Sequence, residues 1–124
     1  MSILKEATVG EYMEALKASD LKDGEMKKIR LRGRDLLLAR VDGRFYSVDD
    51  RCPHLGGSLS RGRLDGTAII CPSHHSCFDL SDGRVLRWTD WTGWTARLAQ
   101  TLRPPQAVAA HSVKVEEGKV WVEV

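Results

Sequence analysis

Two short clusters of cysteine and histidine lie near the middle of the chain. The first pairs Cys52 with His54, the second pairs Cys71 with His74, and 16 residues separate the two clusters. Each cluster offers one thiolate and one imidazole, which are common ligands for transition metals. The separating segment is long enough to leave and return as a hairpin. The pattern C-x-H-x16-C-x2-H therefore predicts two loop tips that hold one metal centre between them.

This ligand set suits either a zinc ion or a [2Fe–2S] cluster in which each ligand type takes one iron. A Cys2His2 zinc finger groups its cysteines together and its histidines together, whereas each cluster here mixes one of each. The mixed order favours iron and sulfur. A disulfide between Cys52 and Cys71 is the second alternative, but three cysteines cannot all pair, and a reducing compartment keeps thiols free.

The composition of the chain is that of an ordinary globular protein. Its 124 residues are 42% hydrophobic and 29% charged with a net charge of +2, which suits a single domain over residues 1–124 and gives no reason to expect nucleic acid binding. Residues 1–13 lack the apolar core of a signal peptide, and no stretch approaches the roughly 20 apolar residues of a membrane helix. We expect a cytoplasmic chain with no membrane partner.

Turn-forming pairs of residues divide the chain into short β-prone runs. The pairs are Asp23-Gly24, Asp42-Gly43, Asp65-Gly66, Asp82-Gly83 and Glu117-Gly118. Such pairs between β-prone runs are hairpin signals. The predicted strands are residues 26–31, 35–41, 44–48, 67–70, 111–116 and 119–124. Apolar and polar residues alternate in the last two runs, as in half-buried antiparallel strands, so we expect an all-β fold.

Two segments do not follow this pattern. Residues 12–21 have the alanine, leucine, glutamate and lysine content of an amphipathic helix, which residue propensity weakly favours. A first strand that ends at the Asp23-Gly24 turn is the open alternative. Residues 95–102 begin with a threonine suited to a helix N-cap and end before two prolines, which predicts a short helix.

The motifs C-P-H-L-G-G, from Cys52, and C-P-S-H-H-S-C-F-D-L, from Cys71, resemble the two cluster-binding loops of Rieske proteins. The likeness extends over residues 20–87 and 108–124, and it is greatest to the soluble Rieske ferredoxins of bacterial oxygenase systems. It implies an antiparallel β-sandwich or barrel with a small two-loop cluster-binding subdomain at about residues 50–80. It also implies that Cys52 and Cys71 hold one iron of a [2Fe–2S] cluster, and that His54 and His74 hold the other.

The function that this resemblance implies is electron transfer. A Rieske ferredoxin accepts one electron from a reductase and passes it to a terminal oxygenase or another redox enzyme, so we expect two redox partners and no catalytic residues. An oxygenase subunit would need a further domain with a mononuclear iron, for which 124 residues leave no room. The alternatives are a non-redox accessory subunit that keeps the fold, and a structural zinc protein with the same four ligands.

Three residues near the ligands are expected to tune the cluster. Gly56 permits a backbone conformation that brings amide groups close to the cluster sulfurs. In high-potential relatives a serine matching Ser76 donates a hydrogen bond to the cluster, and a tyrosine stands at the position of Phe78. The resemblance therefore implies an intermediate reduction potential. The disulfide of those relatives is excluded, because the corresponding positions are Gly57 and Ser73.

The remaining cysteine and histidines are expected to play other parts. We interpret His75 as a residue beside the cluster or exposed to solvent, His111 as a strand residue, and Cys77 as a small buried hydrophobic residue. Residues 88–105 look like an insertion relative to a minimal Rieske ferredoxin. This insertion carries three tryptophans, for which packing onto the barrel is favoured over a docking surface, namely Trp88, Trp91 and Trp94.

Overall fold

The computed structural model describes residues 11–53, 56–72, 75–88 and 105–124, and these residues confirm the all-β prediction. No helix among them is long and apolar enough to cross a membrane. The elements in chain order are β1 (Tyr12–Lys17), the 3-10 helix η1 (Ala18–Asp20), β2 (Met26–Leu31), β3 (Arg34–Val41), β4 (Arg44–Asp49), the 3-10 helix η2 (Leu59–Arg61), β5 (Arg63–Asp65), β6 (Ala68–Ile70), β7 (Cys77–Asp79), β8 (Val85–Arg87), β9 (Ala110–His111), β10 (Val113–Glu116) and β11 (Lys119–Glu123).

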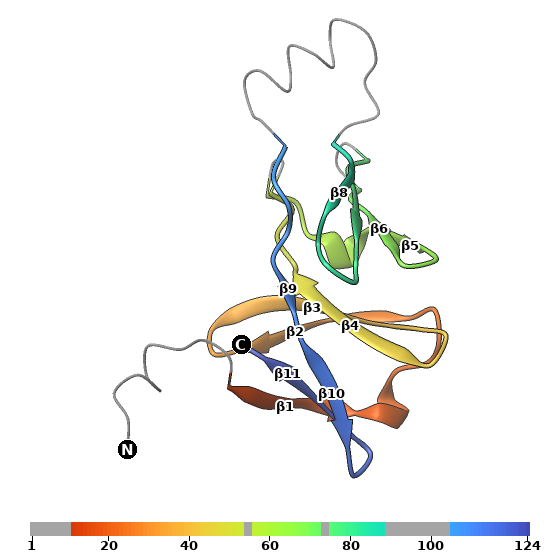
Figure 1. Ribbon diagram of the computed structural model, residues 1–124, viewed down its shortest axis with the longest axis vertical. Helices are drawn as coiled ribbons and strands as arrows, with labels where there is room; N and C mark the ends of the chain where they lie inside the picture. Colours follow the sequence, from red (N-terminus) through yellow and green to blue (C-terminus); the bar gives the residue numbers. More distant parts are fainter. Residues whose placement is uncertain (1–10, 54–55, 73–74, 89–104) are drawn as a thin grey trace, which may run out of the picture.

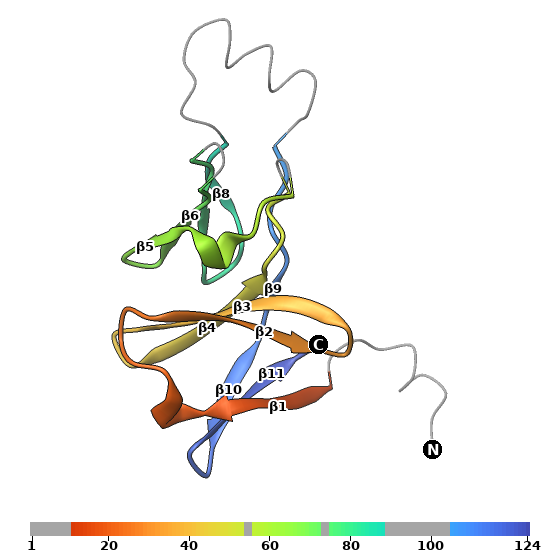
Figure 2. The same cartoon turned by 180° about the vertical axis from the view of Figure 1, so that it is seen from behind.

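The strands form three antiparallel sheets. Their strand orders are β1-β11-β10, β2-β3-β4-β9 and β5-β6-β7-β8. Figure 1 shows the first two sheets together at the bottom of the molecule and the third above them, with the C-terminal strands running down from the upper part. Figure 2 shows the same arrangement from behind. In the sequence, β5 and β6 of the third sheet lie between the two cysteine clusters, and β7 and β8 follow the second cluster. The third sheet is therefore the part that positions the site.

Strand β3 is buried on both faces, which explains its continuous apolar run. Leu36 and Leu38 pack with Val120 and Val122 in the core between the two lower sheets. Leu37 and Ala39, together with Val48 of β4, pack in a second core against the upper sheet. A strand covered on both sides needs apolar residues at every position rather than at every second one. The apolar run of β3 therefore packs both within the lower sheets and against the upper sheet, which carries the site.

Three tight hairpins of two residues each hold the lower sheets in register. Both central residues of each turn have positive φ, which is the geometry that matches the twist of paired strands. The turns are Arg32-Gly33 (φ 53° and 75°), Asp42-Gly43 (52° and 79°) and Glu117-Gly118 (52° and 73°). The last two were predicted from the sequence, while the first lies between two predicted strands and was not.

The strand predictions are confirmed in the lower sheets and incomplete in the upper one. Residues 12–21, for which helix and strand were both open, form β1 followed by one turn of 3-10 helix. The predicted run at 111–116 is divided at Ser112 into β9 and β10. Strands β5, β7 and β8 were not predicted. The helix predicted for residues 95–102 lies outside the described residues, and the subdomain boundaries at 50 and 80 stay a prediction.

Candidate cluster-binding site

Two loops of equal length carry the two cysteines. The first spans residues 51–58 and is closed by an antiparallel bridge between Arg51 and Ser58. The second spans residues 70–77 and is closed where Ile70 of β6 pairs with Cys77 of β7. Cys52 and Cys71 are the second residue of their respective loops. The two loops thus present their thiols from matching positions.

The backbone hydrogen bonds inside the two loops also match. The amide of Cys52 donates to the carbonyl of Gly57 at 2.7 Å, and the amide of Gly56 donates back to the carbonyl of Cys52 at 2.8 Å. In the second loop the amide of Cys71 donates to the carbonyl of Ser76 at 2.8 Å, and the amide of His75 donates to the carbonyl of Cys71 at 3.1 Å. Each cysteine is held by two backbone bonds within its own loop.

Both cysteines are buried in the core of the protein. Each is 1% exposed, and both belong to the core cluster that joins β3 and β4 to the upper sheet. Since neither thiol is in a disulfide, the alternative of a bridge between Cys52 and Cys71 is set aside. Two buried thiols on matched loops are a suitable donor pair for a metal centre. His54 and His74 lie outside the described residues, so their predicted role stays a prediction.

A buried carboxylate supports the first loop from below. Asp50 is 3% exposed, and its side chain accepts hydrogen bonds from the hydroxyl of Ser58 at 2.6 Å and from the amide of Ser60 at 2.8 Å. Its carbonyl accepts a third bond from the amide of Leu59 at 2.7 Å. Asp50 thereby ties η2 to the strand that leads into Cys52. Its role could not be predicted from the sequence, because a single aspartate before a loop has no periodic signal.

Of the residues predicted to tune the cluster, Gly56 lies in the first loop, Ser76 lies in the second, and Phe78 follows directly after the second. The hydroxyl of Ser76, which is fully buried, donates to the carbonyl of Trp88. Phe78 is also fully buried and meets the Trp88 ring edge to face, with the ring centroids 6.4 Å apart. Gly56 donates its amide to the carbonyl of Cys52 rather than projecting it outward. The predicted contacts of Gly56, Ser76 and Phe78 with the cluster stay predictions.

The interpretation of Trp88 as a packing residue is confirmed, since it is 3% exposed within the core cluster. Trp91 and Trp94 lie outside the described residues. Cys77 is buried, and its thiol lies 3.8 Å from the carbonyl oxygen of His75. His75 is exposed, and its carbonyl also accepts a bond from Nε of Arg87 at 3.0 Å. These positions agree with the expectations for Cys77 and His75.

His111 is a strand residue, as expected. It pairs with Ser47 of β4, and its ring bridges two strands: Nε2 lies 2.8 Å from a carboxylate oxygen of Asp49, and Nδ1 lies 3.1 Å from the carbonyl of Glu123. The Asp49 carboxylate also accepts a bond from Arg34 at 3.0 Å. All these partners belong to the lower sheets, so His111 has a structural role there.

The pKa of Asp79, in β7 of the upper sheet, is shifted. The carboxylate of Asp79 accepts two bonds from Ser81, one from the hydroxyl at 2.6 Å and one from the amide at 2.9 Å. These bonds, together with the charge of Arg84 3.4 Å away, lower the pKa of Asp79 in spite of its partial burial. The charged carboxylate of Asp79 therefore stabilises the turn between β7 and β8 through its contacts with Ser81 and Arg84.

The chain is similar to known proteins of one family. The model of the Rieske [2Fe-2S] domain matches residues 11–96. The ferredoxin component of the naphthalene 1,2-dioxygenase system of Pseudomonas putida is 34% identical over 114 residues, covering 92% of this chain and 96% of the relative. The ferredoxin subunit of the 3-phenylpropionate/cinnamic acid dioxygenase of Photorhabdus laumondii is 40% identical, covering 85% of this chain and 87% of the relative.

A solved structure extends the likeness to the fold. It is a complex of reduced oxygenase and oxidized ferredoxin in carbazole 1,9a-dioxygenase, and one of its chains matches with a TM-score of 0.74 and 29% identity, covering 90% of this chain and 92% of that one. The antiparallel sheets, the matched loops and the shared sequence all agree. The chain belongs to the Rieske [2Fe–2S] family, and its cofactor is a [2Fe–2S] cluster.

Proposed function

We propose that this chain is a one-electron carrier that accepts electrons from a reductase and delivers them to a terminal oxygenase or another redox enzyme. The observation that carries the proposal is the pair of equal loops, each of which buries one cysteine thiol in the same core. The relatives named above are ferredoxin components of dioxygenase systems, and one solved relative is in complex with its oxygenase. The chain is a carrier and not itself an enzyme.

The four ligands complete this proposal. Cys52 and Cys71 would hold one iron through their thiolates, and His54 and His74 would hold the other through their imidazoles. When bound, the cluster supplies a centre that takes up and releases a single electron. Neutral imidazoles in place of two thiolates make that centre easier to reduce, with Rieske potentials of roughly −150 to +300 mV against about −400 mV for plant-type ferredoxins. We expect an intermediate value within the Rieske range.

The described residues would keep the cluster in place and exclude water from its sulfur ligands. The matched backbone bonds fix each cysteine within its loop, and the core beneath the loops covers both thiols. Asp50 holds the first loop to η2, and the pairing of β6 with β7 holds the second. A rigid site suits electron transfer, because little rearrangement accompanies the change of oxidation state.

The cytoplasm is the compartment that we propose for this carrier. None of the three cysteines, Cys52, Cys71 and Cys77, is in a disulfide, which is typical of a protein in a reducing compartment. Fractionation of cells that express the native chain tests this point. Recovery of the holoprotein from a periplasmic extract would contradict it.

The direct test is electron paramagnetic resonance of the purified protein after reduction with dithionite. We expect a rhombic signal with an average g below the free-electron value, which is the signature of a reduced [2Fe–2S] centre with mixed ligands. A protein without this signal that contains zinc, or no metal, would refute the carrier function. It would instead support the accessory or structural alternatives.

The ligand set is tested with matched variants. Cys71→Ser and His74→Ala should each lose the visible absorption and the resonance signal of the cluster. Their neighbours provide the controls, because Cys77→Ser and His75→Ala change the same residue types within six residues and should retain both signals. Loss of the cluster in a control variant and its retention in a ligand variant would show that the ligands have been assigned to the wrong positions.

A further inference from the structure

The basic side chains of the chain are distributed unevenly between its two ends. In the lower sheets most of them are neutralised by a carboxylate, as in the contacts of Arg30 with Asp35 at 2.9 Å and of Arg34 with Asp49 at 3.0 Å. The other paired basic residues of these sheets are Lys28, Arg32, Arg40, Lys114 and Lys119. The charge of this end is largely compensated within the molecule.

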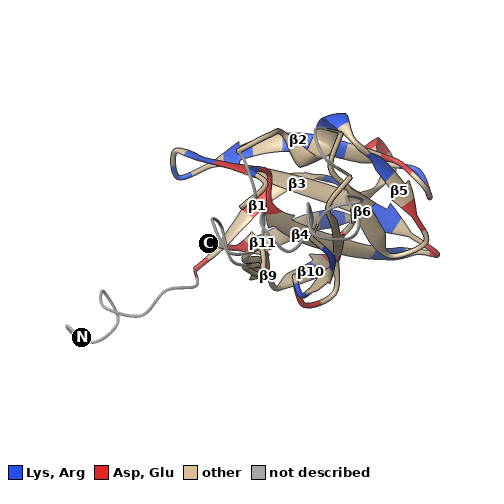
Figure 3. Ribbon diagram, turned by 90° about the horizontal axis from the view of Figure 1, so that it is seen from above, with Lys and Arg blue, Asp and Glu red and all other residues tan. Residues whose placement is uncertain are grey.

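The arginines around the two loops are different. Arg51, Arg61, Arg63 and Arg87 are all exposed, and none of them forms an ion pair with any residue that the structure describes. Residues 51–78 contain three of these arginines but a single acidic residue, Asp65, which lies at the turn between β5 and β6. Figure 3 looks down on this end and shows basic and acidic segments around β5 and β6. The guanidinium groups of these four arginines therefore have no carboxylate partner among the residues that the structure describes.

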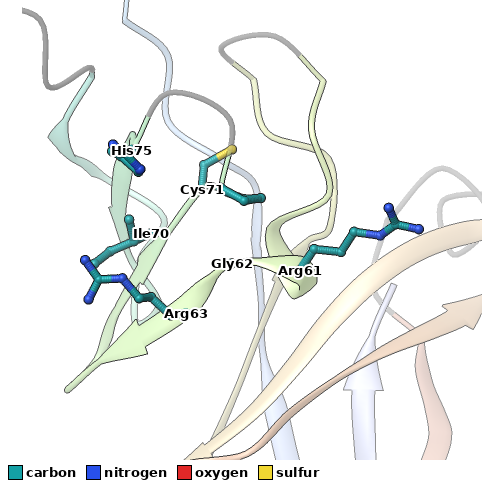
Figure 4. A pocket seen from close by; sticks show the side chains of 7 residues that line it. Arg61, Gly62, Arg63, Ile70, Cys71 and His75 are labelled. Carbon is teal, nitrogen blue, oxygen red and sulfur yellow. The ribbon is translucent and has the colours of Figure 1, made fainter.

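Two of these arginines border a pocket that reaches the second loop. The pocket has a volume of about 280 Å³, and its lining includes Arg61, Arg63, Cys71 and His75. Figure 4 shows the Arg61 and Arg63 side chains leaving the backbone in opposite directions on the two sides of Gly62, with His75 on the Arg63 side of Cys71. Both arginines thus line a pocket next to a buried cysteine, and their guanidinium groups point away from each other.

The backbone between the two arginines is fixed in place. A Cβ atom at Gly62 would lie 1.9 Å from the carbonyl oxygen of Ile70, so this glycine packs directly against β6. The amide of Gly62 also donates to the carbonyl of Leu59 at 2.9 Å, which ends η2. The points at which Arg61 and Arg63 leave the chain are therefore set by the same strand that leads into Cys71.

We propose that this pocket is the docking point for an acidic side chain of the redox partner. Uncompensated guanidinium groups bind carboxylates by paired, charge-assisted hydrogen bonds, and complementary charge increases the rate at which protein partners meet. A partner whose electron-entry or electron-exit site is surrounded by aspartate and glutamate would be drawn to this end of the molecule. The inference rests on the proposed carrier function and adds to it the charge expected on the partner's surface.

A fluorescently labelled decaglutamate peptide is the probe for the binding step. It should bind the holoprotein at low ionic strength, and the double variant Arg61→Gln/Arg63→Gln should weaken binding by roughly tenfold. The control is Lys27→Gln/Arg44→Gln, which removes two exposed charges from β2 and β4, neither of which pairs with a carboxylate among the described residues. The control should bind as the native protein does. Equal weakening in both variants, or equally tight binding of decalysine, would overturn the proposal.

Electron transfer to small oxidants of opposite charge gives a second measurement. The electron leaves the reduced protein for the metal of the oxidant, ferricyanide or hexaamminecobalt(III), and no atom is exchanged. The ferricyanide rate should fall as salt is added and the cobalt rate should rise, with both dependences weakened in Arg61→Gln/Arg63→Gln. The opposite order of salt effects would refute a positive exit surface. A native protein without a resonance signal would instead refute the carrier function, whatever the peptide binds.

Discussion

Gly56 and His75 occupy the same position in the two cysteine loops. Each is the sixth residue of its loop, each has positive φ (79° and 59°), and each donates its amide to the carbonyl of its loop's cysteine. Glycine adopts this conformation without strain, whereas a residue with a Cβ atom pays about 1–2 kcal/mol for it. The second loop therefore carries a backbone strain that the first loop avoids.

We expect His75→Gly to stabilise the protein by about 0.5–1 kcal/mol, because the relief of strain exceeds the added freedom of glycine in the unfolded chain. The midpoint of thermal unfolding should rise by a few degrees at a fixed scan rate. The visible spectrum of the cluster should not change, since His75 is not one of the proposed ligands.

The reverse change provides the control. Gly56→Ala introduces a side chain at φ 79°, with its Cβ 3.3 Å from the guanidinium of Arg51, which is flexible enough to move aside. It should lower the unfolding midpoint by a few degrees because of backbone strain alone. Shifts of the same sign in both variants would contradict the equivalence of the two loops.

The hydroxyl of Ser76 can be examined by a single substitution. It donates to the buried carbonyl of Trp88, so Ser76→Ala should destabilise the protein by about 1–3 kcal/mol by leaving that carbonyl without this donor. Thermal unfolding of the holoprotein measures this cost. Unchanged stability would show that the bond to Trp88 contributes little. A lower reduction potential in the same variant would support the predicted hydrogen bond from Ser76 to the cluster. The single hydroxyl proton cannot be donated to the Trp88 carbonyl and to the cluster at the same time.

The parts of the fold that were predicted are those in which local and tertiary preferences agree. Strands β2, β3 and β4 have β-prone residues between turns whose residues tolerate positive φ, and they form almost as expected. Residues 12–17 have helical preferences instead. They form β1 because they pair with β11, with an irregularity between Glu14 and Leu16, and tertiary pairing outweighs a weak local preference.

Three of the four strands of the upper sheet could not be predicted, for a different reason. Strands β5, β7 and β8 have only three residues each, which is too short for an alternating pattern to appear. The two cysteines were identified because their spacing alone carries the signal. The arginine pocket beside them was missed, since whether Arg61 and Arg63 have carboxylate partners depends on how the sheets fold.

The contact between Gly83 and Val108 joins the C-terminal segment to the upper sheet. The amide of Val108 donates to the carbonyl of Gly83 at 2.9 Å, and a Cβ atom at Gly83 would lie 1.9 Å from the carbonyl oxygen of Val108. Gly83→Ala should therefore destabilise the protein by more than about 3 kcal/mol, as expected for an overlap with backbone that cannot move aside.

Gly66→Ala is the matched control for this variant. Gly66 also has positive φ (60°), but its Cβ would meet no atom within 4 Å, so only the strain of about 1–2 kcal/mol remains. The difference between the two unfolding midpoints isolates the contact with Val108. Similar midpoints would show that the C-terminal segment moves aside at little cost.

Asp79 makes the stability of the upper sheet dependent on pH. Its bonds with Ser81 and its pairing with Arg84 favour the charged form, so its pKa lies below the ordinary aspartate value of about 3.9. Asp79→Ala should cost about 1–2 kcal/mol at pH 7, where the carboxylate is charged in both the folded and the unfolded chain. Asp82→Ala, in the same turn, is a suitable comparison.

The sign of the pH effect follows from linkage. A group whose pKa is lower in the folded state stabilises the fold fully above its unfolded pKa, and this contribution is lost as the pH falls through the folded pKa. The difference in unfolding midpoint between the native chain and Asp79→Ala should therefore be constant from pH 7 to about pH 5 and should decrease below about pH 4. Measurements of the apoprotein and holoprotein at each pH separate this effect from acid loss of the cluster. A difference that grows as the pH falls would mean that Asp79 is held in its neutral form.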